Sequence, residues 1–174
     1  MIELRQLEIK DAPFMLEWMH DPDIQKGFKK NMMDASMDDV LRFIKSNSPI
    51  PGGIVSGTSL HYAIVDDSDE YLGTASLKSI DTKNGTAEYA ITTRKKVQSK
   101  GIAYNATMMM LSKAFFELGL HRVYLSVYSN NRSAIRLYER CGFIYEGEFR
   151  EHFLIDGKRV SWKWYGILKD EFEG

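Results

Sequence analysis

The chain has 174 residues, of which 44% are hydrophobic and 27% charged, and its net charge is −1 at neutral pH. This composition predicts one globular domain over residues 1–174 and excludes a generally basic, nucleic-acid-binding protein. No apolar run approaches the roughly 20 residues that cross a bilayer, and the N-terminus has no basic-then-apolar leader. The single cysteine, Cys141, fits a reducing compartment. We therefore expect a cytoplasmic protein with no membrane partner.

The first part of the chain predicts one strand and two helices. Ile2 to Leu7 alternates apolar and polar side chains, as a half-buried strand does. Asp11 is placed as the N-cap of a helix with a proline in its first turn, and His20 to Pro22 ends that helix. Ser36 caps a second helix, with Asp39 in the position of a capping box.

The middle of the chain predicts an antiparallel meander followed by a long helix. After Ser46 to Ser59, a loop rich in Ser, Pro and Gly, three strand candidates are joined by short polar turns. These strands are His61 to Val65, Tyr71 to Leu77 and Thr86 to Thr92. An apolar helix over roughly Gly101 to Leu118 follows, and Gly119 ends it.

The last part of the chain predicts a strand, a short helix and a hairpin. Val123 to Val127 has apolar residues on both faces, as expected in the centre of a sheet. Asn130 or Asn131 caps a helix that ends before Gly142. Two final strands, joined at Asp156-Gly157, cover about residues 144–155 and 160–168. The whole order predicts an α+β or mixed α/β sheet with helices on both faces.

The stretch Gln98-Ser99-Lys100-Gly101-Ile102-Ala103 lies between the third meander strand and the long helix. A turn of small residues that opens a helix leaves backbone N–H groups free, and these bind phosphate together with the helix dipole. The basic side chains around it would pair with phosphate charge, although such a run can also be a solvated surface. They are Arg94, Lys95, Lys96 and Lys100.

A second motif, Asn131-Arg132-Ser133-Ala134-Ile135-Arg136-Leu137-Tyr138-Glu139-Arg140-Cys141-Gly142-Phe143, lies further along the chain. Together with Gln98-x-x-Gly101-x-Ala103 it resembles the GNAT superfamily of acyl-CoA N-acyltransferases, in the branch of ribosomal-protein, polyamine and amino-sugar acetyltransferases. The resemblance covers nearly the whole chain, because the order of elements matches too. It implies a single acetyltransferase domain, 1–174, with a mostly antiparallel twisted sheet of about seven strands, splayed in the middle, and about four helices.

The resemblance implies acetyl-CoA as the donor and carries its contacts over to particular residues. The loop would hold the pyrophosphate, and the strand before it would bond the pantetheine arm. The implied donor-binding residues are Ile91, Thr92, Thr93, Gln98, Ser99, Lys100, Gly101, Ile102, Ala103 and Asn131.

Two residues are candidates for proton transfer. The resemblance places Tyr138 beside the thioester sulfur, where a phenol of pKa about 10 can protonate the leaving thiolate; a core aromatic is the alternative. Glu88, in the strand before the loop, could accept the proton of the attacking amine, or it could be an exposed strand residue. The four histidines have no metal-ligand spacing, so we expect no metal.

The acceptor amine is left open by the sequence. Trp18, His20 and Phe28, with the loop from Pro49 to Gly57, lie where this family selects its acceptor, and Trp162 on the last strand belongs to the core, a subunit contact or the acceptor wall. Neighbouring charges conflict: three acidic residues favour a cationic acceptor and three lysines an anionic one. These are Glu17, Asp21 and Asp23, against Lys26, Lys29 and Lys30.

The resulting prediction is acetyl transfer from acetyl-CoA to a primary amine by direct attack in a ternary complex. A protein or peptide N-terminus, an amino sugar or nucleotide-linked amino sugar, and a polyamine all remain as acceptors. The alternative function is a non-catalytic acyl-CoA-binding module, against which the intact Tyr138 argues. No nucleic-acid partner is expected, and a homodimer through the terminal strands is compatible with the sequence.

Overall fold

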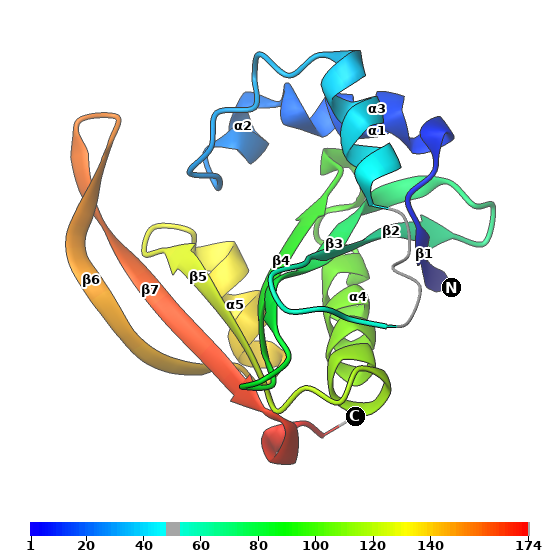
Figure 1. Ribbon diagram of the computed structural model, residues 1–174. Coiled ribbons are helices and arrows are strands. Elements are labelled where there is room, and N and C mark those ends of the chain that lie inside the picture. Colours follow the sequence, from blue (N-terminus) through cyan, green and yellow to red (C-terminus); the bar gives the residue numbers. More distant parts are fainter. Residues whose placement is uncertain (48–52, 174) are drawn as a thin grey trace.

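Figure 1 presents the computed structural model, which describes residues 1–47 and 53–173. The described part contains a seven-stranded sheet in the order β1-β2-β3-β4-β5-β7-β6. Neighbouring strands are antiparallel, except that β4 and β5 are parallel. The strands are β1 (Ile2–Gln6), β2 (Leu60–Asp66), β3 (Tyr71–Asp81), β4 (Thr86–Thr93), β5 (Arg122–Tyr128), β6 (Ile144–Ile155) and β7 (Lys158–Leu168). The predicted α+β fold with a mostly antiparallel sheet is confirmed.

The described helices cover both faces of the sheet (Figure 1). On β2, Ala63 and Val65 pack with α1 and α3, whereas Ile64 points to the opposite face and packs with α4, because successive side chains of a strand alternate. The α-helices are α1 (Ala12–Met19), α2 (Pro22–Gln25), α3 (Met37–Ser46), α4 (Ile102–Ser112) and α5 (Arg132–Arg140). The short helix α2, whose N-cap is Asp21, was not predicted.

The predicted helix boundaries are set by the expected caps, with two differences. Ser36 and Asp39 form the capping box of α3. Asp11 precedes α1, but its carboxylate accepts hydrogen bonds from Arg5 and from the Glu8 backbone instead of capping that helix. The long helix is α-helical only to Ser112, and a π-helical segment, Lys113–Glu117, continues it. Of the predicted loop from Ser46 to Ser59, residues 48–52 lie outside the described part.

The sheet divides between β4 and β5. These parallel strands pair only at their beginnings, from Thr86 opposite Arg122 to Glu88 opposite Tyr124. Beyond Glu88 the strands separate (Figure 1), so the remaining β4 backbone groups have no strand partner on that side and are free to bind a ligand. The splayed sheet implied by the resemblance is therefore present.

The expectation of apolar residues on both faces of β5 is wrong in one respect. Val123, Leu125 and Val127 are buried on the face of α4, but Tyr124 and Ser126 are only half-buried on the other face. Helices α1 and α3 pack on β2 and β3 of the first half of the sheet and leave Tyr124 and Ser126 partly exposed, whereas Tyr128 on the same face is buried against Phe153. None of the described helices has the length and apolar character required to cross a membrane.

Candidate active site

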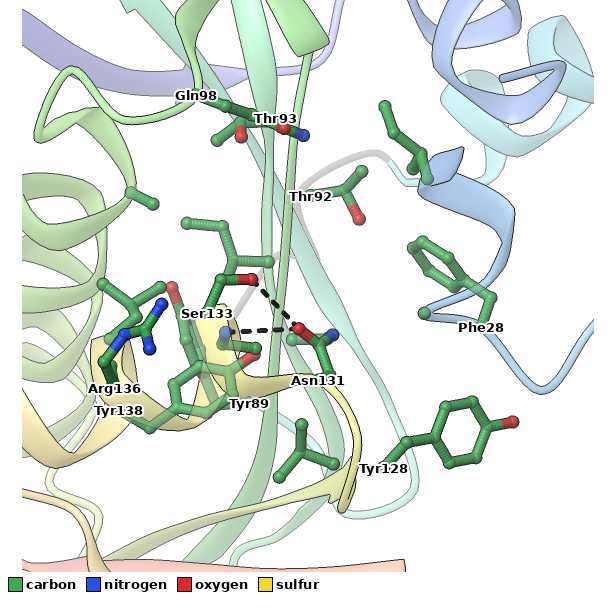
Figure 2. Close-up of a pocket in the computed structure, with 18 of the residues that line it drawn as sticks. Phe28, Tyr89, Thr92, Thr93, Gln98, Tyr128, Asn131, Ser133, Arg136 and Tyr138 are labelled. Atoms are coloured by element: carbon green, nitrogen blue, oxygen red, sulfur yellow. Dashed lines mark hydrogen bonds between the residues drawn. The ribbon is translucent and has the colours of Figure 1, made fainter. Parts of the chain in front are cut away.

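A cleft of about 830 Å³ occupies the place where β4 and β5 separate, a size typical of small-molecule sites. The second half of β4, the loop before α4 and the start of α5 line it, together with the segment after α2 and Trp162 of β7. Figure 2 shows Tyr138 and Arg136 on one side of β4, and Phe28 and Tyr128 on the other. The cleft thus passes through the sheet and is open to side chains from both faces.

The end of the cleft near α4 has the geometry of an anion site. Ser99 and Gly101 have positive φ angles of 62° and 77°, and Gly101 is the N-cap of α4. A Cβ on Gly101 would meet no atom within 4 Å, so glycine is favoured there by the backbone conformation and not by crowding. Gly101 and Ala103 line the cleft, so the free N–H groups at the start of α4 lie beside it, where an anion would gain from the helix dipole.

Most of the implied donor-binding residues line this cleft. Two do not: Ile102 packs against the core and Lys100 is exposed. Asn131 has a clear structural role, because its Oδ1 accepts hydrogen bonds from the Ala134 N–H and the Ser133 hydroxyl at the start of α5 (Figure 2). The residues that line the cleft are Ile91, Thr92, Thr93, Gln98, Ser99, Gly101, Ala103 and Asn131.

The sequence suggested that the basic residues just before the loop would face a bound phosphate. In the structure they do not line the cleft. Arg94 is buried and binds Glu17 and Glu70, each at 2.7 Å. Lys95 pairs with Asp23 at 2.8 Å, and Lys96 pairs with Glu70. Their partners come from α1, α2 and the turn before β3, so these cations fasten the loop to the rest of the molecule.

Other cations, which sequence reasoning missed, line the cleft near α4. Arg136 and Arg140 of α5 line it, and the Arg140 guanidinium lies 4.5 Å from the centre of the Tyr104 ring. Arg132, Arg136 and Arg140 recur every fourth residue, which puts them on one face of a helix. That spacing was the available signal.

Tyr138 lines the cleft from the α4 and α5 face of the sheet. Its ring packs against Tyr89 and Phe143, with centroids 6.4 and 5.8 Å away, and burial raises its pKa to about 12. Its hydroxyl makes no hydrogen bond to a described residue. The hydroxyl is not fully buried either, because Trp164 Nε1 is the only fully buried side-chain polar atom without a partner among the described residues. A hydroxyl that stays protonated and opens into a cleft can donate a proton there.

Glu88 lines the same cleft from β4, at the last paired position before the strands separate. Its carboxylate lies 3.4 Å from the Lys78 ammonium on β3. The next residue, Tyr89, points to the α4 face, as strand alternation predicts, and its hydroxyl bonds Thr107 at 3.0 Å. Glu88 and Tyr138 therefore approach the cleft from opposite faces of the sheet.

The three acceptor candidates occupy different places. Phe28 lines the cleft. Trp18 does not: its indole N–H donates to the Tyr71 hydroxyl at 2.9 Å, and its ring stacks behind Phe28. His20 does not line it either, because its Nε2 hydrogen-bonds the Ala35 carbonyl at 2.8 Å. The aromatic wall opposite Phe28 comes instead from Tyr128 and Trp162, two residues brought close by the pairing of β5 with β7.

Nothing in residues 1–47 and 53–173 forms a group of three or more His, Cys, Asp or Glu side chains able to hold a metal ion. Cys141 is buried, and burial raises its pKa to about 11. A thiol in that environment stays protonated and is a poor nucleophile. Glu88 and Tyr138, which line the cleft, remain the candidates for proton transfer.

Comparisons with known proteins agree with this geometry. Residues 2–144 match the acetyltransferase (GNAT) domain. The chain is 27% identical to an uncharacterized N-acetyltransferase p20 of Bacillus licheniformis, over 99% of this chain and 96% of that one. It is 32% identical to spermidine N(1)-acetyltransferase of Vibrio cholerae, over 64% of each. The solved structure of spermidine N-acetyltransferase from Vibrio cholerae, in complex with CoA and spermine, superposes with a TM-score of 0.85 and 27% identity, covering 98% of this chain and 96% of that one.

The chain therefore belongs to the GNAT acetyltransferase family. It is an acyl-CoA-dependent N-acetyltransferase, with acetyl-CoA as the donor and an amine as the acceptor. These relatives are acetyltransferases, and they give no support to the alternative of a non-catalytic acyl-CoA-binding module.

Proposed function

We propose that the amine attacks acetyl-CoA directly while both substrates are held in the cleft between β4 and β5. The observation that carries this proposal is the position of Glu88 and Tyr138, which line one cleft from opposite faces of a split sheet. A thioester lying in the split would have a base on the acceptor side and an acid on the thiol side. Catalysis would then depend mainly on positioning.

The donor would bind by its backbone-like pantetheine arm and its phosphates. The amides of the arm pair with the free backbone groups of β4 beyond Glu88, as an added strand does. The pyrophosphate lies against the N–H groups at Gly101 and the start of α4, with Arg136 and Arg140 nearby. The backbone N–H of Ile91 polarises the thioester carbonyl.

The proton transfers follow from the two side chains. An alkylamine of pKa about 10 is mostly protonated at neutral pH, so Glu88 takes a proton through water and leaves the neutral amine to attack. A C–N bond forms, the nitrogen of the tetrahedral intermediate loses its second proton to water, and the intermediate collapses to the amide as the C–S bond breaks. Tyr138 donates its proton to the leaving thiolate, and solvent returns a proton to Tyr138.

We also propose a homodimer through the terminal strands and a cytoplasmic location. Strand β6 is the sheet edge, and it exposes several apolar side chains, which favour a partner surface. These include Ile144, Phe149 and Leu154. The location is supported by the lone, buried Cys141. Sedimentation of the purified chain tests the dimer, and a monomer at micromolar concentration contradicts it.

The mechanism is tested by thermal unfolding with and without acetyl-CoA, followed by thiol release against peptides, polyamines and amino sugars. A ligand that binds only the folded state raises the melting temperature. We expect a rise with acetyl-CoA and turnover that requires both substrates at once. A lag-free burst of thiol before the amine is added would indicate an acetyl-enzyme and would refute direct attack.

A further inference from the structure

The acidic residues near the acceptor side of the cleft are already engaged by neighbours. Glu17 binds the buried Arg94 at 2.7 Å. Asp21 caps α2 through the Asp23 backbone N–H at 2.8 Å. The Asp23 carboxylate binds Lys95 at 2.8 Å and Lys26 at 3.1 Å, and hydrogen bonds from these two ammonium groups lower its pKa. The negative charge that would favour a cationic acceptor is therefore largely neutralised.

Two lysines, Lys29 and Lys78, line the cleft. Lys29 lines the cleft, with its ammonium 3.8 Å from the centre of the Trp162 ring, and it forms no ion pair with any described residue. Burial lowers the pKa of Lys29, the Lys78 charge adds to this, and Glu88 opposes it. Lys78 also lines the cleft and pairs with Glu88. This side of the cleft thus presents two ammonium groups and an aromatic surface, together with two carboxylates, Glu88 and Asp23, that are each already ion-paired.

We propose that the acceptor is a primary amine that also carries an anionic group, a phosphate or a carboxylate, bound by Lys29 beside Trp162. This inference rests on the acetyl transfer proposed above and names the class of amine. An anion gains from Lys29, whose ammonium is partly desolvated beside Trp162 and forms no ion pair with a described residue. The additional ammonium groups of a polycation would face Lys29 and Lys78, and the carboxylates of Glu88 and Asp23 that could offset them are already ion-paired. Like charges across an interface are unfavourable.

An anionic amine differs from the acceptor that the similarity to spermidine acetyltransferases suggests, which is a polycation. The fold and donor cleft are shared, but acceptor choice depends on a difference of affinities, which a single repulsive charge can reverse. Lys29 lies on the segment after α2, whereas the catalytic candidates lie on β4 and α5. Specificity and chemistry are therefore carried by different parts of the chain.

The experiment compares kcat/KM for matched amines in the full chain. The panel holds a neutral amino sugar, its phosphate ester, spermidine, and short peptides with an acidic or a basic second residue. We expect the phosphate ester to exceed the neutral sugar by about tenfold at low ionic strength, with the ratio falling as salt is added. The peptide pair tells whether a carboxylate serves as well as a phosphate.

Lys29→Glu is the decisive variant, and Lys30→Glu is its matched control, because Lys30 does not line the cleft. We expect Lys29→Glu to lower kcat/KM for the anionic amine about tenfold and to raise that for spermidine, while Lys30→Glu changes neither. An unchanged acetyl-CoA-dependent melting shift shows that Lys29→Glu is folded. Spermidine as the best substrate, or equal effects of the two variants, would overturn the inference and leave acetyl transfer standing. No amine-dependent thiol release with any member of the panel would withdraw both.

Discussion

Removing the Tyr138 hydroxyl should lower kcat and leave the stability of the fold almost unchanged. In Tyr138→Phe the ring and its packing against Tyr89 and Phe143 remain, and no hydrogen bond to a described residue is lost. The free energy of unfolding should therefore change by less than about 0.5 kcal/mol. If the hydroxyl protonates the leaving thiolate, kcat should fall about 100-fold, equivalent to about 2.7 kcal/mol.

Tyr89→Phe is the matched control, since Tyr89 is a neighbouring buried tyrosine whose hydroxyl bonds Thr107 at 3.0 Å. Losing that bond should cost about 1 kcal/mol and lower the melting temperature by about 2–4 °C. Its kcat should stay close to wild type, because the hydroxyl is engaged by α4.

The two variants are compared by thermal unfolding and by steady-state thiol release with saturating acetyl-CoA. Burial raises the pKa of Tyr138 to about 12, so its ionisation should produce no fall in wild-type kcat below about pH 11. A Tyr138→Phe enzyme with kcat within about twofold of wild type would assign this residue to packing and refute the proposed acid.

Three further outcomes are expected. Glu88→Gln should lower kcat at least about tenfold while leaving the acetyl-CoA melting shift unchanged, and a preserved kcat would exclude Glu88 as the base. Gly101→Ala should cost about 1–2 kcal/mol of stability because of its φ of 77°, whereas Gly101→Glu should in addition raise the KM for acetyl-CoA by placing a carboxylate near phosphate; equal KM values would reject the loop as the phosphate site. Burial lowers the pKa of His61, which hydrogen-bonds Ser76, to about 4. The unfolded chain therefore binds more protons than the folded chain between about pH 6.5 and pH 4. The free energy of unfolding should be at its full value above that range and should fall by up to about 3 kcal/mol as the pH drops through it. In thermal melts at pH 7 and pH 5, His61→Gln should show a smaller pH dependence than the wild type.

Local backbone chemistry made most elements predictable from the sequence. The capping box of Ser36 and Asp39, the Asn131 cap and the Asp156-Gly157 turn each depend on a few adjacent residues. The turn before α4 was predictable for the same reason: a positive φ at Gly101 and the free N–H groups of a helix start are short-range properties. Strand alternation likewise predicted that Glu88 and Tyr89 face opposite ways.

The partner of each charge was not predictable, because it depends on segments distant in the sequence. Arg94 and Glu17 are 77 positions apart, and their pairing removes both from the roles that the local sequence suggested. Trp18 and His20 were placed near the acceptor, but the packing of α1 turns them toward Tyr71 and Ala35.

The sequence by itself determined the family, most of the elements in their order and the turn before α4, because these depend on local spacing and backbone preference. Only the tertiary structure decided which charges line the cleft near Trp162. It placed Lys29 over Trp162, on segments far apart in the chain, and it neutralised Asp23 with Lys95. The energy of two charges depends on the distance between them. For residues far apart in the sequence, that distance is set by the tertiary packing of strands and helices.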